Sequence, residues 1–295
     1  MTMMFRTGRA ALLLLLMGSV LPLQAAELEI GAVHGLVIGM EDQTVRYEKH
    51  ADVAVPIASL TKLMTALVVV ESGADLEQWL EVLPASHEVD KNAFTRLRQG
   101  SEARRRDLLL LALMASENLA AQLLADHHPG GRKAFVAAMN AKAKALGMTQ
   151  TWYVDSSGLS PMNRSSARDQ AALVLAAYQQ PLIRELSTPS FQSVSFRKPR
   201  YQLGYGNTNG LIYSQRWQVA LSKTGDLSEA GRCWVMGPEV ADEPMVMVFL
   251  DALGKRTPLG DAGRVRRWLE SGQVSPVAAA AKQYQARKVA TLEQL

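Results

Sequence analysis

Two residues near the start of a long apolar stretch could act together on an acyl group. Ser59 and Lys62 stand three positions apart, so a helix would place the hydroxyl and the amine on one face, one turn apart. A lysine can activate a serine nucleophile if burial or a neighbouring cation lowers the pKa of its amine. The same spacing recurs at Ser195 and Lys198, but that stretch is polar and lacks a helical pattern, so we interpret it as a chance match.

Two further segments contain polar groups that could complete such a site. Ser116-Glu117-Asn118 interrupts a helical pattern, and an extended bend there would aim Ser116 and Asn118 in the same direction. Lys223-Thr224-Gly225 ends a predicted strand; its lysine and hydroxyl suit a carboxylate, and its glycine leaves space for the backbone of a ligand. Taken singly, the segments are also compatible with helix caps or a hairpin turn. Their combination favours a serine nucleophile with a lysine base.

Hydrophobic periodicity predicts the elements that must hold these segments, with strands at both ends of the chain and helices between them. The predicted strands are 33–40, 44–48, 217–225, 231–238 and 244–252. The predicted helices are 59–73, 104–128 with a break at 115–118, 131–146, 167–179 and 260–271. Because strands from the two ends would be neighbours, we expect an α/β (α+β) fold, in which an antiparallel sheet is flanked by helices and interrupted by an all-helical insertion.

Composition restricts the class of protein. Residues 1–25 contain two arginines, an apolar run and a small-residue cleavage site, which is typical of a secretory signal peptide rather than a membrane span. The formal net charge of +4 falls further without those arginines, and no long basic run is present, so we expect no nucleic-acid partner. The single cysteine, Cys233, cannot form an internal disulfide and is predicted to be a buried structural thiol.

Other candidate motifs are interpreted as structural. The five histidines lack a metal-binding spacing such as HExxH, so we expect neither a metal nor a cofactor. The glycine-rich stretch 203–210 lacks the flanking elements of a nucleotide site and is predicted to be a loop. The arginines at 104–106 are expected to form a solvated helix start. A conventional Ser-His-Asp hydrolase would need a GxSxG elbow or its equivalent, and the sequence has none.

The three motifs resemble the signature S-x-x-K, S-x-N and K-T-G of the penicillin-binding proteins and serine β-lactamases. The resemblance continues from HGLVIG through PIASLTKLMT, LLLALMASENLAA, SSARD, SKTG and EAGRC, and it is greatest to low-molecular-mass D-alanyl-D-alanine peptidases of the endopeptidase (penicillin-binding protein 7) type. It implies a β-lactamase/transpeptidase-like domain at 26–272, with an α/β part at 26–75 and 210–272 and a helical insertion at 76–190. Residues 273–295 would be a tail, in place of the added domain and membrane anchor of the carboxypeptidases.

The resemblance also implies roles for the motif residues. Ser59 would be the acylated nucleophile, Lys62 its base, Ser116 the relay of a proton to the leaving amine, and Asn118 a contact to the substrate amide. The substrate-binding strand would contribute Lys223 and Thr224 to the free carboxylate, with Gly225 beside them and the backbone N–H of Asp226 in the oxyanion hole together with that of Ser59. Lys223 is in addition a candidate for the cation that lowers the pKa of Lys62.

The implied function is a periplasmic endopeptidase that hydrolyses D-alanyl-diaminopimelate cross-links between peptidoglycan peptide stems and is acylated by β-lactams. A D-alanyl-D-alanine carboxypeptidase is the main alternative; a β-lactamase and a non-catalytic binding protein are less favoured. Thr208 stands where the carboxypeptidases have an arginine that holds the terminal carboxylate. Asp155 and Asp169 do not occupy a recognisable position for a deacylating acid. We expect Arg232 to neutralise Asp226 beside the oxyanion hole.

Overall fold

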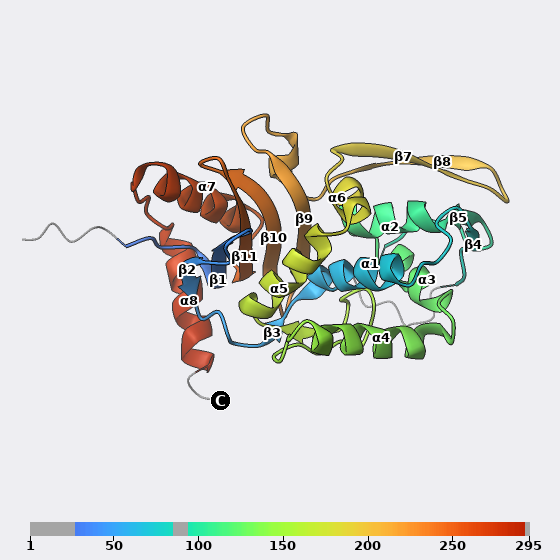
Figure 1. The fold of residues 1–295 in the computed structure, drawn as a ribbon, viewed down its shortest axis with the longest axis horizontal. Helices are drawn as coiled ribbons and strands as arrows, with labels where there is room; N and C mark the ends of the chain where they lie inside the picture. Colours follow the sequence, from blue (N-terminus) through green and yellow to red (C-terminus); the bar gives the residue numbers. More distant parts are fainter. Residues whose placement is uncertain (1–26, 85–93, 293–295) are drawn as a thin grey trace, which may run out of the picture.

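The computed structural model describes residues 27–84 and 94–292. Its centre is a five-stranded antiparallel sheet with the order β2-β1-β11-β10-β9 (Figure 1). The strands are β1 (Ala32–Gly39), β2 (Val45–Lys49), β9 (Val219–Leu227), β10 (Gly231–Val240) and β11 (Glu243–Ala252). As predicted, strands from the two ends of the chain are neighbours, and His34 of β1 lies opposite Leu250 of β11. Strand β9 is at the edge of the sheet.

Helices cover both faces of the sheet. Helix α5 (Ala167–Tyr178) packs on one face, whereas α7 (Arg256–Ser271) and the tail helix α8 (Ala279–Leu292) pack on the other. Every residue of β1 is buried, because both faces of this strand are covered. The edge strand β9 therefore belongs to a sheet that helices cover on both faces.

A group of helices from the middle of the chain lies beside the sheet (Figure 1). It comprises α1 (Thr61–Glu71), α2 (Arg105–Met114), α3 (Asn118–Asp126), α4 (Gly131–Ala145) and α6 (Pro181–Ser187). The first four begin and end close to the predicted positions, and the predicted break separates α2 from α3. The α/β class and the helical insertion into an antiparallel sheet are thus observed.

Several short elements were not predicted. A hairpin of β7 (Phe191–Phe196) and β8 (Tyr201–Gly206) projects from the body of the molecule, and β8 includes half of the stretch predicted to be a loop. Most side chains of β7 are exposed, so the hairpin lacks an apolar alternation that sequence reading could detect. The remaining elements are the strand pairs β3 (Val55–Pro56) with β6 (Arg164–Ser165) and β4 (Trp79–Glu81) with β5 (Glu102–Arg104), and the 3₁₀ turns η1 (Ala58–Leu60) and η2 (Gly210–Tyr213).

The arginine run at 104–106 and the predicted signal peptide have different outcomes. The predicted solvated arginine run is wrong for Arg105, whose side chain is buried and donates to the carbonyl of Asp75 and to Gln78. The predicted signal peptide, 1–25, lies outside the described residues. In the described part of the chain, no helix combines the length and apolar character needed to cross a membrane.

Candidate active site

Ser59 lies in a strained turn at the point where the sheet meets the helices. It is the middle residue of η1, directly before α1, and Ala58 in front of it has a left-handed backbone with φ of 48°. A non-glycine residue adopts this conformation only when its surroundings hold it there. Lys62 is in the first turn of α1, so the predicted spacing of one turn is observed.

Two glycines let the chain pack closely around the turn that carries Ser59. A Cβ on Gly158 would lie 2.0 Å from the carbonyl oxygen of Ala58, and one on Gly225 would lie 2.9 Å from that of Ile57 and 3.2 Å from the Ser59 nitrogen. Gly225 also lines the pocket, so the space predicted for the backbone of a ligand stays a prediction. Its lack of a Cβ lets the backbone that presents Ser59 approach β9 closely.

The amine of Lys62 has a contact for each of its three hydrogens. It lies 2.8 Å from the Ser59 hydroxyl oxygen, 2.7 Å from Asn118 Oδ1 and 2.5 Å from the carbonyl oxygen of Ser157. The last two atoms can only accept hydrogen bonds, whereas a hydroxyl can accept or donate. When the amine is neutral, its two hydrogens satisfy the two acceptors and its lone pair faces the Ser59 hydroxyl. The site is therefore arranged for a lysine base.

Burial makes the neutral form of Lys62 accessible. The side chain is fully buried, and this desolvation lowers the pKa of the amine to about 7, although the charges of Asp155 and Glu117 oppose the shift. Lys223 is also buried, and its pKa is lowered well below the usual range by desolvation and by the nearby Lys62. Loss of water, rather than the charge of Lys223, is the main cause of the low pKa at Lys62.

The segment between α2 and α3 places Ser116 and Asn118 on the same pocket, but not through an extended bend. Ser116 has a left-handed backbone with φ of 57°, and Asn118 is the first residue of α3. Between them, the buried Glu117 turns away and caps α3 by accepting from the backbone N–H of Ala120. The predicted extended bend is therefore wrong, but Ser116 and Asn118 still line the same pocket, with Ser116 in a left-handed backbone conformation.

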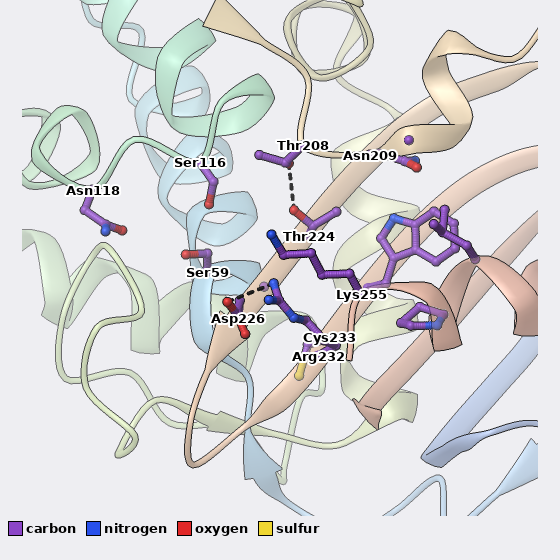
Figure 2. Close-up of a pocket in the computed structure, with 15 residues that line it drawn as sticks. Ser59, Ser116, Asn118, Thr208, Asn209, Thr224, Asp226, Arg232, Cys233 and Lys255 are labelled. Carbon is purple, nitrogen blue, oxygen red and sulfur yellow. Dashed lines mark hydrogen bonds and ion pairs between the residues drawn. The ribbon is translucent and has the colours of Figure 1, made fainter. Parts of the chain in front are cut away.

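These groups open into a pocket of about 520 Å³ (Figure 2). Its walls come from η1, the α2–α3 segment, β9, β10, η2 with the two residues before it, the loop before α7 and the first turn of α7. The lining residues comprise polar groups around Ser59 and an apolar wall further from it: Ser59, Ser116, Asn118, Thr208, Asn209, Gly210, Thr224, Gly225, Asp226, Arg232, Cys233, Trp234, Lys255, Pro258 and Leu259.

The Lys223-Thr224-Gly225 motif lies within β9, which continues to Leu227, so the prediction that it ends the strand is wrong. Thr224 faces the pocket, whereas the Lys223 side chain is buried and donates to the carbonyl of Thr224 at 2.7 Å. Lys223 shares the face of β9 with Gly225, which is turned toward Ser59, and it lies near Lys62, but it is not among the residues that line the pocket.

Thr208, which stands where the carboxypeptidases have an arginine, and Asp226, the acid next to the oxyanion hole, both line the pocket. The Thr224 hydroxyl donates to the Thr208 hydroxyl at 2.6 Å, so Thr208 contacts the group that is expected to bind the substrate carboxylate. Asp226 forms an ion pair with Arg232 at 2.8 Å, which confirms the predicted neutralisation (Figure 2). The acid beside Ser59 thus does not present an uncompensated charge.

The other candidates make no contact with the Lys62 amine, although Cys233 is among the residues that line the pocket. Ser195 is on the exposed hairpin and Lys198 pairs with Glu102, in agreement with a chance match. Cys233 is buried against the carbonyls of Pro56 and Ala230, and burial raises the pKa of its thiol to about 12, as expected of a structural cysteine. His34 is buried and bonds to the carbonyl of His50.

The two aspartates considered as deacylating acids, Asp155 in a loop and Asp169 in the first turn of α5, both accept hydrogen bonds from loop residues. Asp155 accepts hydrogen bonds from the backbone N–H groups of Ser157, Gly158 and Ser160 and from the Ser157 hydroxyl. Asp169 accepts from the backbone of Gln150 and the hydroxyl of Thr151. Neither residue lines the pocket.

Sequence reading missed two contributors to the site. One is the loop 155–160, whose Ser157 carbonyl holds Lys62 and whose Gly158 supports the Ser59 turn. The other is Lys255, which lines the pocket from the loop before α7. A backbone carbonyl has no signature in side-chain type, and an isolated lysine outside the three motifs has none either.

Comparison with known proteins agrees with this geometry. The profile of the D-alanyl-D-alanine carboxypeptidase (Peptidase S11) family matches residues 22–254. Curated proteins named D-alanyl-D-alanine endopeptidase from Pseudomonas aeruginosa and Escherichia coli are 48% and 44% identical over 268 residues, which is 91% of this chain and 86% of each relative. The crystal structure of the Streptomyces K15 DD-transpeptidase superposes with a TM-score of 0.76 at 26% identity, covering 81% of this chain and 96% of that one. The chain belongs to the Peptidase S11 family of serine DD-peptidases.

Proposed function

We propose that this protein is a D-alanyl-D-alanine endopeptidase that hydrolyses cross-links between peptidoglycan peptide stems through an acyl-enzyme on Ser59. The observation that carries the proposal is the contact of 2.8 Å between the Lys62 amine and the Ser59 oxygen, in a site where burial lowers the pKa of the amine to about 7. The identity of the chain to the two named endopeptidases supports the choice of substrate.

In the first step, the Ser59 oxygen bonds to the carbonyl carbon of D-alanine as its proton moves to Lys62. The carbon–nitrogen bond then breaks, and the proton passes through Ser116 to the leaving amine. The backbone N–H groups of Ser59 and Asp226 would stabilise the oxyanion, and the Asn118 amide would contact the substrate. In the second step, water adds to the ester, restores the Ser59 hydroxyl and releases the stem as a carboxylic acid.

The substrate would lie along β9, the edge strand of the sheet, as an added strand. This places the free carboxylate next to the scissile bond near Thr224, while the buried Lys223 donates to the Thr224 carbonyl. We name the part of the pocket lined by Thr208, Thr224, Arg232 and Lys255 the leaving-group side.

A β-lactam would acylate Ser59 by the same first step, but its leaving amine stays attached to the ring-opened product. No carboxylate lining the pocket in the described part of the chain is free to activate water, since Asp226 is paired with Arg232. Slow release of the drug, rather than β-lactamase turnover, is therefore part of the proposal.

Incubation of the purified protein with a cross-linked stem dimer and, separately, with an uncross-linked pentapeptide tests the substrate. We expect monomers to be released from the dimer faster than D-alanine is released from the pentapeptide, as followed by chromatography. The reverse order would make the protein a carboxypeptidase.

We further propose that the protein acts in the periplasm after removal of residues 1–25, on the basis of the signal-like composition of that segment. N-terminal sequencing of protein from the exported fraction should begin at Ala26. Recovery only from membranes, with residues 1–25 intact, would contradict this proposal.

A further inference from the structure

The leaving-group side of the pocket contains a cation that none of the three motifs includes. Lys255 is exposed, lines the same pocket as Ser59 and Thr224, and directs its amine into that pocket on the side of Thr224 (Figure 2). Among the residues that the structure describes, it has no hydrogen-bond or ion-pair partner. A lysine held at a pocket without a partner is free to bind an anion.

The other basic side chains near this position are occupied or remote. Arg232 lines the pocket but is paired with Asp226 at 2.8 Å. Lys223 is buried and does not line the pocket, and its amine donates to the Thr224 carbonyl. Thr208 adds a hydroxyl but no charge. A substrate carboxylate beside the scissile bond would therefore meet one unpaired positive charge among the described pocket residues, that of Lys255.

The pocket wall next to Lys255 is apolar and could contact an aliphatic chain. Trp234 of β10 and Pro258 and Leu259 of α7 line the pocket on this side. The pocket volume of about 520 Å³ exceeds what one methyl-bearing residue such as D-alanine would fill. A leaving group with a carboxylate at the reacting end and several methylenes behind it would use both the cation and the wall.

We propose that Lys255 is a specificity-determining residue that binds the free carboxylate of the leaving D-amino acid, while Trp234, Pro258 and Leu259 contact its aliphatic chain. This inference rests on the proposed function, and it assigns recognition of the carboxylate of the leaving group to a residue outside the three motifs. Lys255 contacts the substrate and takes no part in proton transfer, so its removal should raise KM more than it lowers kcat.

The test compares a cross-linked dimer whose D-centre carboxylate is free with the same dimer amidated at that carboxylate. The wild type should cleave the free acid at least about tenfold faster by kcat/KM, as expected for a charge-assisted contact. In Lys255→Gln this preference should fall to about twofold or less, mainly through KM, and Lys255→Arg should restore it. Arg256→Gln is the matched control, because Arg256 is also exposed but does not line the pocket.

The result that overturns the inference is an unchanged preference for the free acid in Lys255→Gln, or an equal loss in Arg256→Gln. The same comparison on a pentapeptide and its C-terminal amide keeps the two proposals distinguishable. If the wild type prefers the pentapeptide to the dimer, the endopeptidase assignment fails, while the effect of Lys255→Gln on the acid-to-amide ratio still decides the role of Lys255.

Discussion

The two sides of the pocket are built differently. Around Ser59 and Lys62 the groups are buried and held by hydrogen bonds, and three separate segments meet at the Lys62 amine. On the leaving-group side Thr224 and Thr208 bond to each other, and Lys255 extends from a surface loop without a described partner. Fixed geometry suits bond making and breaking, whereas adjustable contacts suit the choice of leaving group. Changes on the first side should therefore abolish the reaction, and changes on the second should redirect it.

The largest effect is expected from Lys62→Met, which keeps the length of the side chain and removes the base. Acylation by a β-lactam should slow by about 10²–10⁴-fold, as is typical when a general base is lost. In the wild type, the acylation rate should rise with pH through about 7, because only the neutral amine of Lys62 can accept the proton. Stopped-flow acylation across pH 5–10 measures both. A flat wild-type profile, or an active Lys62→Met, would assign the base to another residue.

A smaller loss on the same side should follow from Gly225→Ala. The added Cβ would lie 2.9 Å from the Ile57 carbonyl oxygen, so the Ser59 turn must shift. We expect a loss of about 1–3 kcal/mol in the free energy of unfolding, measured by denaturant titration, together with slower acylation. Gly263→Ala in α7 is the control, since nothing lies within 4 Å of its Cβ position; it should be neutral or stabilising. Equal behaviour of the two variants would contradict the packing role of Gly225.

Asp155→Asn should shift the pH dependence rather than remove activity. The Asp155 charge raises the pKa of Lys62, so its loss should lower that pKa and move the rise of the acylation rate to lower pH. Asparagine retains one acceptor oxygen for the loop 155–160. Asp169→Asn serves as the comparison, because the contacts of Asp169 are to Gln150 and Thr151. A shift of the pH profile in both variants would indicate a general loosening of the structure. No shift in either variant would contradict the electrostatic effect of Asp155 on Lys62.

The smallest effect is expected on the leaving-group side, from Thr208→Arg. An arginine next to Thr224 would add a charge for a terminal carboxylate, so the ratio of pentapeptide to dimer cleavage should rise by about two- to tenfold. Chromatography of the two product sets gives the ratio, and Thr208→Lys tests whether charge alone is sufficient. A ratio that stays constant would mean that position 208 does not influence the choice of leaving group.

Much of the fold and most of the site could be predicted from the sequence, for identifiable physical reasons. The strands β1, β10 and β11 and the helix α1 are buried over most of their length, so the sequence shows each as a long apolar run, whereas α4 buries only Phe135, Met139 and Ala143 at helical spacing. The β7–β8 hairpin could not be predicted, since most side chains of β7 are exposed and β8 falls in a glycine-rich stretch. Short helix α6, with Pro181 in its first turn, has too few residues for a periodic signal.

The candidate site also has parts that the sequence predicts and parts that it does not. Side chains within the three motifs were identified by type and spacing, and the structure brings them together. The Ser157 carbonyl and the close approach of Gly158 were not foreseeable, because they depend on how the loop 155–160 folds over η1. The burial of Lys223 and the position of Lys255 depend on the packing of β9 and α7, which no short motif encodes.

The central claim is that Ser59 forms the acyl bond, and peptide mapping by mass spectrometry tests it most directly. After incubation with benzylpenicillin, the protein should carry one ring-opened penicilloyl group on the tryptic peptide that contains Ser59, and Ser59→Ala should carry none. Label on the peptide that contains Ser195, or label that survives in Ser59→Ala, would contradict the account.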